Sequence, residues 1–162
     1  MNISGCSWLR MLCLGVASLL MVSCERTADD FEVWGLDVSR HQKEVNWEKV
    51  LEHEQPNFVF IKATEGTLIV DPPYEKHRAE LEKTGVLWGA YHFFGHRTPG
   101  KEQARNFIKT AKLKHGNLIP VLDIEWHRFM KDPKRSAREA KNFCREIKRY
   151  YGVNPIIYCS TN

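Results

Sequence analysis

The stretch LIPVLDIE, residues 118–125, combines a run of apolar side chains with two carboxylates. Residues 118–122 are almost wholly apolar, which is typical of a strand buried on both faces, as in a parallel sheet. Residues two apart in a strand project to the same face, about 7 Å apart along the chain, so Asp123 and Glu125 share a face while Ile124 points into the packing. We predict a strand over residues 118–124 with a carboxylate pair at its carboxyl end.

Four further strands are predicted, and a helical segment precedes each strand after the first. Apolar runs predict strands at 33–38, 58–63, 86–93 and 155–159, and start and stop signals predict helices at 46–54, 73–84, 98–112 and 136–151. Asn46, Thr98 and Ser136 are the expected N-terminal signals, Pro73 lies in a first turn, and Gly85 is the expected left-handed C-cap. Strands separated by helical crossovers run parallel, which favours an α/β fold, with a TIM-like barrel as the leading candidate.

The number of predicted strands is smaller than a complete barrel needs. An eight-stranded barrel usually takes roughly 200 to 250 residues, whereas the chain has 162 residues and its fifth predicted strand ends at residue 159. We therefore expect a modified β/α barrel that is incomplete at its C-terminus.

The N-terminus has the pattern of an export signal. Residues 11–22 are apolar or small and follow Arg10, and such a segment is too short to span a membrane as a helix. It ends at Leu20–Cys24, which resembles a bacterial lipobox, although Met21 stands where Leu is commoner. We predict a lipoprotein signal peptide at 1–24 with Cys24 lipidated, a tether at 25–32 and a catalytic domain at 33–162, placed outside the cytoplasm. An ordinary cleaved signal peptide or a buried helix is the alternative.

The net charge indicates which class of partner is favoured, and the cysteine positions indicate which disulfide could form. The net charge is +4, or about +3 without the leader, and no Lys/Arg stripe alternates with aromatic residues, so nucleic acid is not favoured. A mild positive field suits an anionic polymer such as cell wall. Of five cysteines, only Cys144 and Cys159 lie outside the leader, where they could pair or remain buried free thiols.

Acidic and aromatic residues stand where the predicted strands end. These residues are Asp37, Glu65, Tyr91, His92, Phe93, Asp123, Glu125 and Tyr158. In parallel α/β folds, ligands bind beyond the carboxyl ends of the strands. A single acid in such a place is more often a helix cap, but several converging acids predict a site. The aromatic side chains could fill the core, or they could stack on sugar rings.

The carboxylate pair indicates acid catalysis. Two carboxylates so close cannot both ionise freely, so one retains a proton and can protonate a glycosidic oxygen near neutral pH. The other reading, a solvent-facing edge strand, fits poorly with the apolar run that precedes the pair. His92 and His96 raise the question of a metal, but no H-x-x-x-H or H-E-x-x-H motif supports one. Ser39 lies in no G-x-S-x-G motif, and Cys159 has no obvious catalytic partners.

The chain also contains ordered blocks that resemble the glycoside hydrolase family 25 muramidases. The blocks are Gly35–Ser39 with Gln42 and Trp47, Ile61–Gly66, Asp71-Pro72, Gly89–Phe93, Asp123–Glu125 and Ile157-Tyr158. The resemblance implies a modified barrel that hydrolyses the β-1,4 bond between N-acetylmuramic acid and N-acetylglucosamine in peptidoglycan, without metal or organic cofactor.

The same resemblance implies roles for individual residues. Glu125 takes the general-acid position, and Asp123 is the partner acid that assists the substrate's own 2-acetamido group. Asp37 supports them, and the expected substrate-binding residues are Glu65, Tyr91, Phe93 and Tyr158. Two other functions remain open: a peptidoglycan-binding lipoprotein without catalysis, and a hydrolase of chitin-like polymers.

Overall fold

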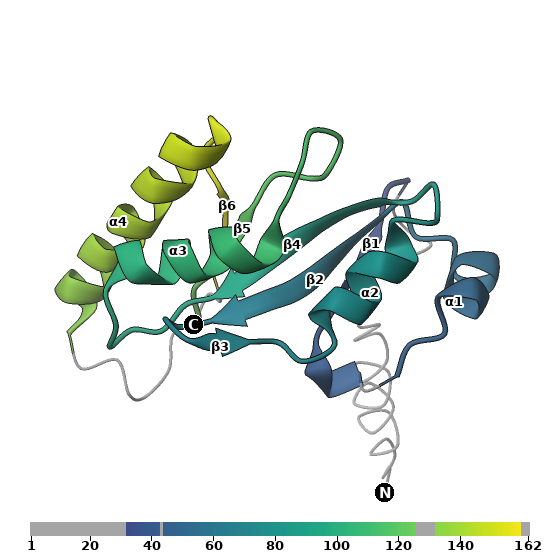
Figure 1. The fold of residues 1–162 in the computed structure, drawn as a ribbon, viewed down its shortest axis with the longest axis horizontal. Helices are drawn as coiled ribbons and strands as arrows, with labels where there is room; N and C mark the ends of the chain where they lie inside the picture. Colours follow the sequence, from purple (N-terminus) through teal and green to yellow (C-terminus); the bar gives the residue numbers. More distant parts are fainter. Residues whose placement is uncertain (1–31, 43, 126–131, 160–162) are drawn as a thin grey trace, which may run out of the picture. The chain divides into compact units, whose positions relative to one another are not determined.

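A parallel sheet is the central element of the computed structural model, which describes residues 32–42, 44–125 and 132–159 (Figure 1). Neighbouring strands follow the order β1-β2-β4-β5-β6, and each pair along this path is parallel. The strands are β1 (Gly35–Val38), β2 (Phe58–Glu65), β4 (Leu87–Phe93), β5 (Val121–Asp123) and β6 (Ile156–Tyr158). The predicted α/β class with a parallel sheet is therefore confirmed.

The sheet is not closed into a barrel within the described residues. Its path runs from β1 at one end to β6 at the other, and no pairing joins these two strands in the described ranges. A short strand, β3 (Ile69–Val70), folds back and pairs antiparallel with β2. The sequence analysis missed β3 because it has only two residues and follows a turn in which Gly66 adopts a positive φ of 54°.

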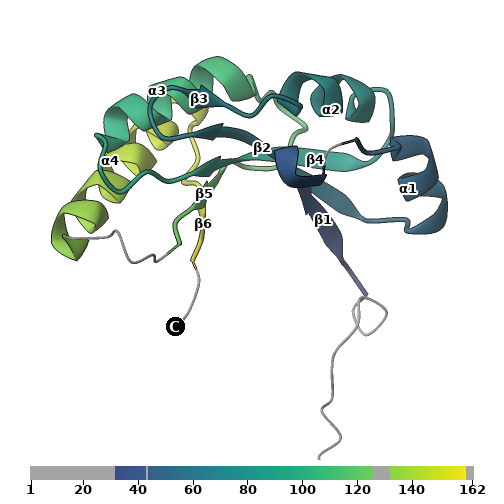
Figure 2. The ribbon, with the colours of Figure 1, turned by 90° about the horizontal axis from the view of Figure 1, so that it is seen from below.

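Helices cover the outer face of the curved sheet (Figure 2). They are α1 (Trp47–His53), α2 (Tyr74–Leu81), α3 (Gly100–Ala111) and α4 (Pro133–Tyr151). A 3₁₀ turn, η2 (Arg40–Gln42), follows β1 and has no buried residue. The views in Figures 1 and 2 agree that α3 and α4 lie side by side. No helix in the described ranges is both long and apolar enough to cross a membrane.

Several predicted helix boundaries need correction. Asn46 caps α1 as predicted, since its side chain accepts a hydrogen bond from the Lys49 amide at 3.1 Å. Gly85 is not the left-handed cap of α2, because that helix already ends at Leu81, where the Thr84 hydroxyl donates to the Leu81 carbonyl. Thr98 likewise does not cap α3, because its hydroxyl donates to the carbonyl of Gly95.

The start of α4 and the length of β5 also differ from prediction. Asp132, not Ser136, caps α4, accepting a hydrogen bond from the Arg135 amide at 2.9 Å ahead of the first-turn proline. Ser136 is instead buried in the first turn. The β5 strand spans three residues rather than 118–124, because Pro120 lacks the N–H that a central strand needs.

The hydrophobic core lies between the sheet and its helices. The outward side chains of the strands alternate with the inward ones, and the outward set is buried against α3 and α4. Fully buried members of this core are Val59, Ile61, Ala63, Ala90, Leu122, Phe107, Ala111, Phe143 and Ile147. Because the helices take up the outer face, the inner face is left to carry the polar and aromatic side chains described next. The predicted leader, Cys24 and nearly all of the predicted tether lie outside the described residues.

Candidate active site

Parallel register aligns the inner-face side chains in rows across the sheet. The row nearest the carboxyl ends contains Glu65, Phe93, Asp123 and Tyr158 on β2, β4, β5 and β6. The next row contains Lys62, Tyr91, Val121 and Ile156, and Asp37 pairs with Phe60 in the row below. Residues far apart in sequence therefore meet on one face because of strand register.

An inner-face pocket of about 330 Å³ gathers most of the predicted site residues. It contains Asp37, Tyr91, Asp123, Glu125 and Tyr158, and its other lining residues are Leu36, Phe58, Phe60, Val121 and Ile156. Three carboxyl groups among apolar and aromatic walls match the usual composition of a small-molecule site, and the volume lies within the usual range for one. Glu65 and Phe93 do not line this pocket.

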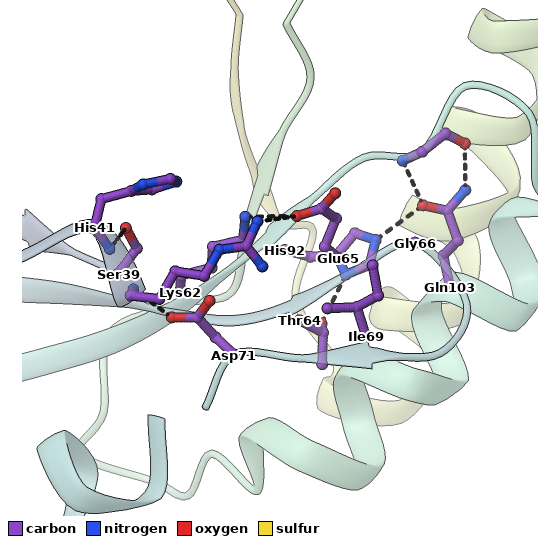
Figure 3. Close-up of polar contacts among 12 residues, drawn as sticks. Ser39, His41, Lys62, Thr64, Glu65, Gly66, Ile69, Asp71, His92 and Gln103 are labelled. Carbon is purple, nitrogen blue, oxygen red and sulfur yellow. Dashed lines mark hydrogen bonds and ion pairs between the residues drawn. The ribbon is translucent and has the colours of Figure 1, made fainter. Parts of the chain in front are cut away.

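Glu65 and Phe93 instead contact a buried lysine, Lys62, which Figure 3 shows beside Glu65. Lys62 is only 5% exposed, and its ammonium lies 2.8 Å from Glu65 Oε2 and 4.6 Å from the centre of the Phe93 ring. Arg40 lies 3.8 Å from the same carboxylate oxygen. A register shift in β2 between Lys62 and Thr64 brings Lys62 and Glu65 to the same face although they are three residues apart. Lys62 is not among the site residues predicted from the sequence, although a charged residue inside the apolar run 58–63 is a signal for one.

The electrostatics of the pocket centre on Asp123. Burial, and then the neighbouring Glu125 carboxylate, raise the pKa of Asp123 to about 6, while Lys62 acts in the opposite direction. Asp123 Oδ1 is buried and has no hydrogen-bond partner among the residues that the structure describes. The expected general acid of the pair is Glu125, whereas the raised pKa belongs to its partner, Asp123. Burial and the charge of Asp37 also raise the pKa of Tyr91.

His92 lies on the opposite face of β4 from the pocket. Its ring is fully buried and stacked on Phe143 at 4.9 Å between centroids. Its Nδ1 lies 2.7 Å from the Thr64 hydroxyl, and its Nε2 lies 2.9 Å from Gln103 Oε1. Burial lowers the pKa of His92 to about 4, so the ring is neutral at physiological pH. His92 therefore stabilises the core and does not face the proposed substrate.

Gln103 is the partner that sequence reasoning missed. Its Oε1 also accepts from the Gly95 amide, and its Nε2 donates to the carbonyls of Gly95 and Thr98 (Figure 3 shows Gln103 beside His92). The fully buried amide thus uses both acceptor and both donor positions. It fixes the turn that follows β4. A second cleft, of about 440 Å³, lies beside this turn and contains Glu65.

Metal binding and nucleophilic catalysis by cysteine or serine have no assembled group of side chains in the described ranges. There, no cluster of three or more His, Cys, Asp or Glu side chains is arranged to hold a metal ion. Cys144 and Cys159 are both free thiols, and Cys159 is exposed, so neither the pair nor two buried thiols is present. The Ser39 hydroxyl lies 3.2 Å from Gln42 Oε1, so it contacts an amide and not a general base.

Comparison with known proteins gives the family. The sequence model of "Glycosyl hydrolases family 25" matches residues 36–162. The chain belongs to this family. The fold of the family 25 chain is similar to that of a family 25 glycosyl hydrolase from Bacillus anthracis, with a TM-score of 0.75, 33% identity and coverage of 83% of this chain and 63% of that one.

Two curated proteins are also similar to this chain in sequence. The family 25 chain is 32% identical to the protein YegX of Escherichia coli K12 over 137 residues, which are 82% of this chain and 50% of YegX. It is 36% identical to Lysozyme M1 of Streptomyces globisporus over 108 residues, or 62% of this chain and 36% of that protein. The chain thus spans about half the length, or less, of these curated relatives.

The motif blocks of this family 25 chain lie on successive elements of the sheet. Gly35–Ser39 covers β1, Ile61–Gly66 ends β2, Gly89–Phe93 forms most of β4, Asp123–Glu125 ends β5 and Ile157-Tyr158 ends β6. Asp71 is buried beside them, and its carboxylate accepts from the Arg40 amide at 2.8 Å. The blocks are thus distributed along the chain but adjacent in the sheet.

Proposed function

We propose that the chain carries the catalytic face of a muramidase that hydrolyses the β-1,4 bond between N-acetylmuramic acid and N-acetylglucosamine in peptidoglycan. The observation that carries the proposal is the inner-face pocket in which Asp123 and Glu125 lie together with Asp37. Membership of family 25 and the similarity to a protein named Lysozyme M1 support the same reaction.

In the proposed reaction, Glu125 is the general acid. It donates its proton to the glycosidic oxygen as the bond from that oxygen to the anomeric carbon breaks. The carbonyl oxygen of the substrate's 2-acetamido group bonds to the anomeric carbon and forms a cyclic cation. Water, deprotonated by Glu125, then opens the ring and restores the acetamido group and the acid.

Asp123 stabilises that cation in the proposed reaction. Its pKa is raised because burial and Glu125 both disfavour ionisation, and the positive charge of Lys62 offsets this only in part. A cation that forms beside it therefore gains more than it would beside a solvated acid. Asp37 supports the pair, and the rings of Tyr91 and Tyr158 line the pocket where they can contact sugar faces.

The expected setting is the cell wall, outside the cytoplasm. The lipobox-like segment ending at Cys24 supports a membrane anchor, and the mild positive charge suits an anionic polymer. Peptidoglycan glycan strands are the proposed partner. Glu65 and Phe93 do not line the pocket. Both contact Lys62, whose charge lowers the pKa of Asp123, so their proposed effect on the site is electrostatic and indirect.

Release of reducing ends from purified peptidoglycan tests the proposal. The wild-type chain is expected to produce them, and Glu125→Gln should reduce the rate by about 10²- to 10⁴-fold because the acid is lost. Exposed Glu52 on α1 provides the matched control, since Glu52→Gln should leave the rate unchanged. Absence of new reducing ends from the folded wild type would contradict the proposal.

A peptidoglycan-binding function without catalysis is the second candidate. It is favoured by one observation, that the rings of Tyr91 and Tyr158 line the pocket where they can contact sugar faces without taking part in bond cleavage. Co-sedimentation of wild-type chain with peptidoglycan, combined with no turnover, would support this candidate. Equal cleavage of chitin oligomers and peptidoglycan would instead indicate a hydrolase of chitin-like polymers.

A further inference from the structure

The hydrogen-bond ladder between β4 and β5 extends beyond the last paired residues. The Phe94 amide donates to the Asp123 carbonyl at 2.8 Å. In a parallel ladder, the next acceptor on the same edge is two residues further on, which is the Glu125 carbonyl, and its donor would be the amide of residue 96. The β4 strand ends at Phe93, and the Gly95 amide, which points to the other edge, donates to Gln103 Oε1 at 2.8 Å in the turn that follows.

The side chain of His96 supplies a donor to this acceptor. Its Nε2 lies 2.8 Å from the Glu125 carbonyl oxygen. A carbonyl only accepts, so Nε2 carries a hydrogen and donates. The other ring nitrogen, Nδ1, lies 2.5 Å from the hydroxyl of Ser136, a buried residue in the first turn of α4. The ring is 8% exposed and makes an edge contact with Phe94.

We infer that His96 is a positioning residue for Glu125, with Ser136 fixing the orientation of its ring. Glu125 lies two residues beyond the end of β5, so its backbone needs contacts from outside the strand to stay in place. On the β6 side, the Ile124 amide donates to the Tyr158 carbonyl at 2.9 Å, and on the β4 side His96 supplies the corresponding contact. The inference rests on the proposed role of Glu125 as general acid.

Position matters here because proton transfer requires the acid within hydrogen-bond reach of the glycosidic oxygen. A displacement of about 1 Å can reduce a rate by about 10²-fold without removing any reacting group. Loss of the His96 contact is therefore expected to lower kcat more than it raises KM, since the pocket walls that contact the sugar remain.

Two substitutions at His96 test whether its hydrogen bond to the Glu125 carbonyl, and not the size of its side chain, determines the rate. In His96→Leu, both hydrogen bonds are lost, and kcat on peptidoglycan should fall about 10- to 100-fold with KM changed less than about threefold. In His96→Gln, the amide nitrogen can reach the position of Nε2 and donate to the Glu125 carbonyl, so kcat should recover to within about threefold of wild type. His115→Leu is the control at an exposed histidine and should leave both constants unchanged.

Amide hydrogen exchange gives a readout that does not depend on activity. His96→Leu should speed exchange of the Ile124 amide relative to that of Val59 in the buried β2 strand, and His96→Gln should restore it. If the wild type is inactive but these exchange changes occur, the proposed function fails while the positioning contact stands. Wild-type kcat in His96→Leu, or equal losses in the Leu and Gln variants with unchanged exchange at Ile124, would overturn the inference.

Discussion

Asp123 illustrates how a single residue's surroundings determine its charge. Its carboxyl shares the pocket with Glu125 and Asp37, and one of its oxygens is buried with no partner in the described part of the chain. The Lys62 ammonium partly offsets this, but Lys62 is itself paired with Glu65 at 2.8 Å. The result is an acid that ionises near pH 6 rather than near its usual value of 3.8.

This raised pKa predicts a pH-dependent stability difference. The contribution of protonated Asp123 to folding is fully present below about pH 4 and is lost as the pH rises through about 6. Asp123→Asn should therefore raise the free energy of unfolding at pH 8 by about 1 kcal/mol, allowing for solvent screening of a partly exposed group, and change it little at pH 3.5. Urea denaturation at both pH values measures this. Glu52→Gln should show no such pH-dependent gain, and an equal effect of Asp123→Asn at both pH values would contradict the assignment.

Gln103 is the residue whose loss should cost the fold most in hydrogen bonds. Gln103→Leu keeps the volume but leaves the partner groups of His92, Gly95 and Thr98 unsatisfied in the interior. We expect the free energy of unfolding to fall by about 3 kcal/mol, measured by chemical denaturation. Asn106→Leu removes two longer, partly exposed bonds of 3.2 Å and should cost less than about 1 kcal/mol. Similar losses in both variants would show that burial of Gln103 is not what matters.

At the scale of elements, the contact between α3 and α4 depends on Gly100. A Cβ at this position would overlap the carbonyl oxygen of Glu139, which is backbone and cannot swing away. In an exposed helix Gly→Ala stabilises by up to about 1 kcal/mol, but here the steric overlap dominates. Gly100→Ala should lower the free energy of unfolding by about 3 kcal/mol.

A second glycine provides the control for this prediction. At Gly85, an added Cβ would meet nothing within 4 Å, and the φ angle is not left-handed. Gly85→Ala should therefore be neutral or stabilise by a few tenths of a kcal/mol. Thermal or urea unfolding of both variants compares the two sites. A neutral Gly100→Ala would mean that α3 and α4 can separate without loss of stability.

At the scale of the whole molecule, the edge of β6 that faces away from β5 is expected to promote association between chains. Within the described residues, β6 pairs only with β5, and its apolar side chains are open to solvent, with Ile157 57% exposed. An exposed apolar edge strand with unpaired backbone groups is a site for association with other chains. We predict that the 162-residue chain self-associates as its concentration rises, and that Ile157→Lys reduces this association.

Light scattering over a concentration series measures this effect. Val153→Lys is the control, because Val153 is also exposed, at 41%, but lies in the connection before β6. The Ile157 substitution should reduce scattering while the Val153 substitution does not. Equal scattering by wild type and Ile157→Lys would exclude β6 as the surface responsible.

The sequence by itself determined the parallel α/β class, because apolar runs and helical crossovers are local patterns. The two-residue period of a strand also predicted that Asp123 and Glu125 share a face, and both line the pocket although Glu125 lies beyond the end of β5. The sequence placed helices correctly but not all of their ends, since competing caps such as Asp132 and Ser136 differ only in what they contact. The tertiary structure alone decided that Lys62 pairs with Glu65, that His96 contacts the Glu125 backbone and that Asp123 has a raised pKa. These features depend on register, a bulge and burial, which join residues distant in the chain.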